Sequence, residues 1–140
     1  MKTYTLIAIV IVTLALLCYT VGTVSQQRSR RITPTALGFL TVGLVCDVVA
    51  TIFMILGSGQ LVSLHGVLGY SALAGMLVEV AVAWRWHVRN RDRAVTEGMR
   101  RYARLAYGYW VVAFISGGLL VGMARRAAGA AALIGAAALG

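Results

Sequence analysis

Three ionisable side chains lie inside long apolar segments of this chain, namely Asp47, His65 and Glu79. At 100° per residue along a helix, Glu79 falls about 40° from His65, and Ala72 and Met76 lie on the same face. An ionisable group in hydrocarbon costs on the order of a few kcal/mol unless it finds a partner or water. We therefore expect this helix face to look into protein, with the rest of the chain packed around it.

His65 is the natural ligand for a cofactor, because an imidazole nitrogen can bind haem iron axially or bind copper. Met54 precedes it by a short turn, which places both side chains at nearly the same depth, and Met123 reaches a similar level. A His/Met pair ligates haem and also suits copper. Gly66 and Gly69 would let a porphyrin or another helix approach closely. The alternative is a histidine that only bonds its neighbours.

The two carboxylates support other hypotheses. Asp47 shares a stripe with Gly43, Thr51 and Met54, where it would orient a polar partner or a haem propionate, or bond a neighbouring helix as a protonated acid. Asp47 and Glu79 at staggered depths would also suit a proton-coupled exporter of a cationic substrate. A third hypothesis is a non-catalytic accessory subunit that recognises partner membrane helices through small residues.

Several classes of protein are excluded by the sequence. It contains no glycine-rich phosphate loop, no HExxH motif and no Ser-His-Asp set in plausible reach, so we expect no enzyme. Cys18 and Cys46 fall inside apolar segments and predict neither a disulfide nor a metal site. The net charge of +9 comes from arginines at segment ends, which indicates membrane topology and not nucleic-acid binding.

The composition places the chain in a membrane, because 60% of its residues are hydrophobic, 12% are charged and the mean hydropathy is +0.84. Four apolar runs, residues 4–24, 35–56, 61–84 and 105–124, are long enough to span a bilayer. The sequence therefore predicts an all-α integral membrane four-helix bundle, antiparallel and up-down, in one domain of residues 1–126. Residues 127–140 form an Ala/Gly-rich tail too short to span, expected to be a surface helix or disordered.

The basic loops 25–34 and 87–104 are expected on the cytoplasmic side, whereas the turn at residues 57–60 carries no charge. This orientation puts both termini outside and predicts a multi-pass protein of the bacterial inner membrane. Its partners would be membrane lipid, a homodimer copy or partner helices. Tyr107, Tyr109 and Trp110 are typical of an aromatic belt at the membrane interface.

Across residues 6–123 the chain resembles the HsmA family of small four-helix bacterial membrane proteins. The resemblance rests on short motifs at residues 14–22, 43–54, 64–77 and 116–123, including Asp47, Met54 and His65. It implies sequestration of haem, here haem b, near the outer half of the bilayer. Where the family has a second histidine this chain has Glu79, and near the family's third histidine it offers Arg101 or Tyr102.

Overall fold

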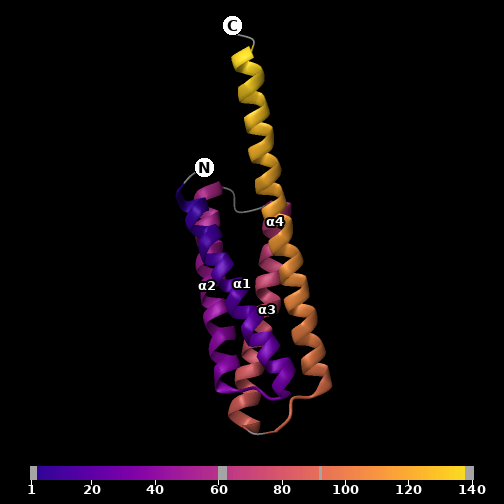
Figure 1. Ribbon diagram of the computed structural model, residues 1–140. Coiled ribbons are helices and arrows are strands. Elements are labelled where there is room, and N and C mark those ends of the chain that lie inside the picture. Colours follow the sequence, from indigo (N-terminus) through magenta and orange to yellow (C-terminus); the bar gives the residue numbers. More distant parts are fainter. Residues whose placement is uncertain (1–2, 60–62, 92, 138–140) are drawn as a thin grey trace.

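The computed structural model describes residues 3–59, 63–91 and 93–137 and places them in four α-helices with no strand among them. The helices are α1 (Thr3–Ser29), α2 (Pro34–Ser58), α3 (Leu64–Asn90) and α4 (Glu97–Ala137) (Figure 1). Each is long and apolar enough to cross a membrane, so the prediction of four such helices is confirmed. The predicted start of the third run at residue 61 and the last three residues of the tail lie outside the described residues.

Local sequence fixes the ends of the central helices. Thr33 caps α2 by accepting a hydrogen bond from the Ala36 amide, and Pro34 occupies the first turn, where its missing N–H costs nothing. Gly59 ends α2 in the left-handed conformation, with φ 67°, and its N–H bonds the Ile55 carbonyl. Ser63 caps α3 in the same way through the Gly66 amide.

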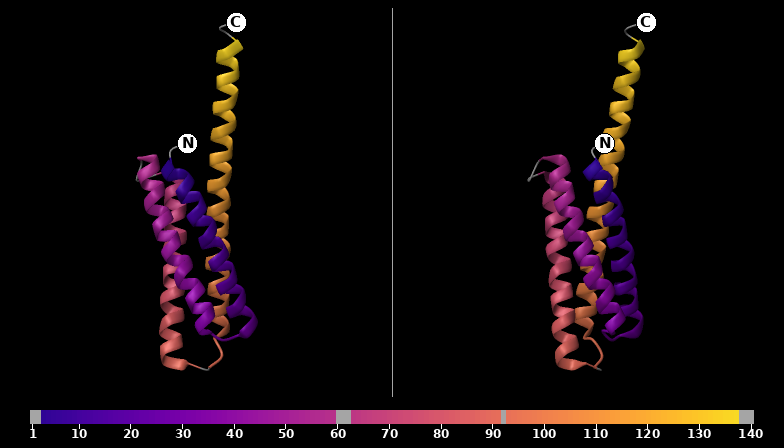
Figure 2. Two further views of the ribbon diagram at one scale, coloured as in Figure 1. Left: turned by 60° about the vertical axis from the view of Figure 1, so that its left-hand side comes forward. Right: turned by 90° about the vertical axis from the view of Figure 1, so that its left-hand side faces the viewer.

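The helices run alternately up and down (Figures 1 and 2). The end of α1, the start of α2, the end of α3 and the start of α4 lie together at one end, called here the basic end. The start of α1 and the end of α2 lie at the other end, called the turn end. α1 packs most closely against α2, and α3 against α4. Within the described chain α1 and α3 make no close backbone contact. This leaves room for side chains between them.

Glycine allows the close approach of α1 and α2. A Cβ at Gly43 would lie 2.8 Å from the Tyr19 ring, and one at Gly22 would lie 2.8 Å from Leu40. The sequence instead suggested the small residues of α3 as the site of close approach. Gly69 and Gly75 have open space where their side chains would be, so no other helix of the described chain packs closely there, and the approach of a flat ligand stays a prediction. Helical periodicity alone does not reveal which small residue meets a neighbour.

The main core draws buried side chains from all four helices, namely Val12, Ala15, Tyr19, Leu40, Ala50, Ala72, Met76, Val80, Trp110 and Ala113. A second buried cluster, Ile32, Leu37, Ala83 and Val95, lies at the basic end. The inward face predicted for α3 is thus observed at Ala72 and Met76.

The C-terminal tail differs from the expectation of a separate surface helix or a disordered segment. α4 is one helix of 41 residues, about 60 Å long at 1.5 Å per residue, and it continues through residue 137 beyond the other three helices (Figure 2). The high helix propensity of alanine explains the continuation. The helical span therefore has no boundary near residue 124.

Candidate functional site

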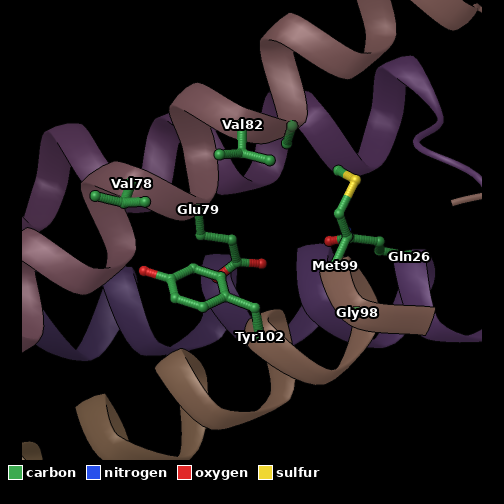
Figure 3. Close-up of a pocket in the computed structure, with 8 residues that line it drawn as sticks. Gln26, Val78, Glu79, Val82, Gly98, Met99 and Tyr102 are labelled. Atoms are coloured by element: carbon green, nitrogen blue, oxygen red, sulfur yellow. The ribbon is translucent and has the colours of Figure 1, made fainter. Parts of the chain in front are cut away.

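Glu79 is a buried carboxylate in the middle of the protein-facing side of α3. It is 3% exposed, and neither carboxylate oxygen has a hydrogen-bond partner among the described residues. The side chain lines a cavity of about 240 Å³, with Gln26, Tyr102 and Met99 around it (Figure 3). A cavity of this size has room for several waters or for one small organic ligand.

Three helices form this cavity. α3 contributes Val78, Glu79, Val82 and Ala83, α4 contributes Gly98, Met99 and Tyr102, and α1 contributes Gln26. Val78, Val82 and Tyr102 are each more than a third exposed, so the cavity reaches the surface of the bundle. Its position in the first turns of α4 and the last turns of α1 places it near the basic end.

The Tyr102 ring lies beside Glu79, but its hydroxyl does not bond the carboxylate. The hydroxyl donates to the Gly75 carbonyl at 3.0 Å, and it points away from the Glu79 oxygens in Figure 3. Tyr102 therefore lines the cavity with its aromatic ring, while its hydroxyl is engaged by the Gly75 carbonyl.

Other buried polar atoms without a partner gather in the same half of the bundle. Within residues 3–59, 63–91 and 93–137 these side-chain atoms belong to Thr23, Gln26, Gln27, Glu79, Trp86 and Arg100. All six residues come from the parts of α1, α3 and α4 nearest the basic end. Buried polar groups in proteins normally have a partner in protein or ordered water, so this half is suited to water or a polar ligand.

Asp47 has a different environment. It is 5% exposed, and its Oδ2 accepts a hydrogen bond from the Trp110 indole at 2.6 Å and a longer one from the Tyr19 hydroxyl at 3.5 Å. The Tyr19 and Trp110 rings meet edge to face, with centroids 5.1 Å apart. Asp47 thus joins α2 to α1 and α4. Trp110 is 4% exposed, so it packs inside the bundle, and its prediction as an interface residue stays a prediction.

His65 faces α4. Its Nδ1 lies 3.3 Å from the Ser116 hydroxyl, and a Cβ at Gly117 would lie 2.7 Å from its Nε2. Both ring nitrogens therefore lie against the α4 turn that contains Ser116 and Gly117. This contact leaves no room for a haem iron at either nitrogen in the present helix arrangement.

The other predicted cofactor residues have separate environments. Met54 is partly buried against the main core, whereas Met123 is 67% exposed. Gly66 is partly buried and Gly69 has open space at its α-carbon. In the part of the chain that the structure describes, no three His, Cys, Asp or Glu side chains group as metal ligands.

Sequence reasoning singled out both acids but missed their surroundings. Gln26 carries a recognisable signal, a buried amide one turn before the end of an apolar helix, although nothing in the sequence pairs it with Glu79. Trp110 as the partner of Asp47 has no sequence signal, because the two residues are far apart in the chain and their meeting depends on how α2 and α4 pack.

Comparison with protein-family models, with curated proteins and with solved structures finds no match to this chain. The resemblance to the HsmA family stays a prediction.

Proposed function

We propose that this protein is a small membrane carrier that binds a small organic cation at Glu79 and exchanges it for a proton. The observation that carries the proposal is a buried carboxylate without a partner in a surface-reaching cavity. Intramembrane acids that face a cavity are typical of substrate and proton pathways. One carboxylate can hold a proton or a cation, so binding of one would release the other.

The lining of the cavity favours an organic cation over a metal ion. Val78, Val82 and Met99 offer apolar surface, and the Tyr102 ring beside Glu79 suits a quaternary ammonium through its electron-rich face. A metal ion would need more ligands than the one carboxylate and the Gln26 amide supply. The volume of about 240 Å³ limits the ligand to a small molecule.

Asp47 supports this function without touching the ligand. Because its carboxylate is engaged by Trp110 and Tyr19, it holds α1, α2 and α4 in register. The proposal therefore assigns ligand binding to Glu79 and a positioning role to Asp47, in place of two equivalent transport carboxylates.

The test uses proteoliposomes that enclose a pH-sensitive dye, with benzyltrimethylammonium as a permanently charged probe. Addition of the probe should drive proton movement in the wild type, and Glu79→Gln should abolish it. The variant should fold, because it replaces an unpaired buried acid by a neutral group. Loss of a charge-assisted contact predicts about 10- to 100-fold weaker probe binding.

Glu97→Gln is the matched control, since Glu97 is an exposed acid at the same end, paired with Arg100 and Arg104. It should behave as the wild type. A neutral probe of the same shape, neopentylbenzene, should move no protons. Proton movement that persists in Glu79→Gln would refute the assignment.

The orientation is part of the proposal. The arginines of the loops at residues 30–33 and 91–96 favour the basic end as the cytoplasmic side of a bacterial inner membrane, with both termini outside. The Glu79 cavity would then open near the cytoplasm. Cysteine labelling at Ser58 and at Arg93 by a membrane-impermeant maleimide in intact cells would test this, with label expected only at position 58.

Haem binding at His65 is the second prediction from the sequence. Since both imidazole nitrogens lie against Ser116 and Gly117, the residues as placed do not fit a haem, and no step of the function is derived through one. Titration with haemin, with His65→Ala as the comparison, tests the prediction directly. A saturating Soret shift that is lost in His65→Ala would favour the haem hypothesis over the carrier.

A further inference from the structure

A second cavity lies at the end of α3, next to the Glu79 cavity, with which it shares Val82. The inference drawn from it does not rest on the proposed carrier function. It measures about 220 Å³ and is lined by Val82, Arg85, Trp86, Arg89 and Asn90. These residues form the last turns of α3, at the basic end, where a membrane-spanning helix meets the level of the lipid headgroups.

Two arginines give the cavity its charge. Arg85 and Arg89 stand four residues apart, so their side chains leave the same face of α3. The ion pairs within the described residues join Glu97 to Arg100 and Arg104, and none involves Arg85 or Arg89. Both guanidinium groups are therefore available to an anion from outside the protein.

The Trp86 indole adds a donor without an acceptor. Trp86 packs against the second buried cluster, formed by Ile32, Leu37, Ala83 and Val95, and its Nε1 is buried with no partner in the described chain. The other two tryptophans are satisfied, since Trp84 donates to Thr41 and Trp110 to Asp47. A buried donor without an acceptor would gain a hydrogen bond from an acceptor oxygen that entered beside it.

We propose that this cavity binds the phosphodiester of an anionic glycerophospholipid. Guanidinium groups hold phosphate oxygens through paired N–H donors, and Asn90 and the Trp86 indole offer further donors. Val82 supplies an apolar wall on the membrane side. The site lies on the flank of the helix and not on a loop, so a lipid reaches it from within the bilayer.

The experiment measures the unfolding temperature of the detergent-purified full chain during titration with phosphatidylglycerol, with phosphatidylcholine as the uncharged reference lipid. Phosphatidylglycerol should raise the unfolding temperature in a saturable manner. The double variant Arg85→Gln/Arg89→Gln should bind about thirtyfold more weakly, from the usual contribution of two arginines near a lipid surface. Trp86→Phe should weaken binding while the charge stays the same.

The matched control is Arg28→Gln/Arg101→Gln, which removes two exposed arginines at the same end that do not line this cavity. It should bind phosphatidylglycerol as the wild type does. An equal loss in this control would mean that only total charge matters and would overturn the site. Equal protection by free glycerol 1-phosphate would replace the lipid by a soluble phosphate ester.

Discussion

Removal of the Trp110 indole donor should destabilise the protein through Asp47. In Trp110→Phe, the buried carboxylate keeps only the 3.5 Å contact with the Tyr19 hydroxyl, because the 2.6 Å bond from the indole is lost. A hydrogen bond to a charged group is worth about 1.5–3 kcal/mol in proteins. Pairs inside membranes average about 0.6 kcal/mol, with a maximum near 1.7.

We expect a coupling energy of about 1.5 kcal/mol between Trp110 and Asp47, near the maximum found for hydrogen bonds inside membranes, because both residues are at most 5% exposed. A double-mutant cycle isolates this term. Trp110→Phe and Asp47→Leu are measured singly and together, so the loss of ring area cancels from the coupling energy.

The assay is reversible unfolding of the purified protein in mixed micelles with increasing sodium dodecyl sulfate, followed by helix content. The control cycle uses Trp84→Phe and Thr41→Val, since the Trp84 indole donates to the neutral Thr41 hydroxyl at 3.0 Å and Trp84 is 47% exposed. The coupling energy from this control cycle should be about 0.5 kcal/mol. A coupling energy for Trp110 and Asp47 no greater than that of the control would refute the view that Asp47 joins the helices.

Two further predictions concern glycines at helix contacts. Gly43→Ala should lower the free energy of unfolding by about 1–3 kcal/mol in the same assay, because the new Cβ would lie 2.8 Å from the Tyr19 ring. Gly69→Ala has open space around the new methyl group, so it should be neutral or stabilising by up to about 1 kcal/mol. Equal effects would contradict the close approach of α1 and α2. Gly117→Ala should displace the His65 imidazole, which lies 2.6 Å from the new Cβ, and should expose the α3–α4 contact to limited proteolysis in micelles. An unchanged digestion pattern would speak against that packing.

The sequence alone was sufficient for the existence of the four helices and for the start of α2, but not for the end of α4, which continues through residue 137. Four apolar runs of membrane length predict four helices, and Thr33 with Pro34 marks the start of α2. The spacing of Ala72, Met76 and Glu79 predicts that one face of α3 looks inward, and all three are at most 3% exposed. These features depend on hydrophobicity, chain length and local hydrogen bonds, which a sequence contains in full.

Sequence reasoning was weakest where two helices must meet. Asp47 and Glu79 look alike in the sequence, since each is a single acid in an apolar run. The packing gives Asp47 a donor from Trp110, and it leaves Glu79 facing a cavity. That difference depends on the rotation and separation of the helices, which the periodicity of one helix does not contain.

The chain by itself thus determined which segments are helices long and apolar enough to cross a membrane, because the cost of exposing a charge or an amide to hydrocarbon applies to each segment separately. Only the tertiary structure decided which buried acid has a hydrogen-bond donor and which has none among the described residues. Side-chain packing between helices decides which hydrogen-bond partners meet. At the contacts of Gly43 with Tyr19 and of Gly117 with His65, a single added methyl group would change the distance between the helices.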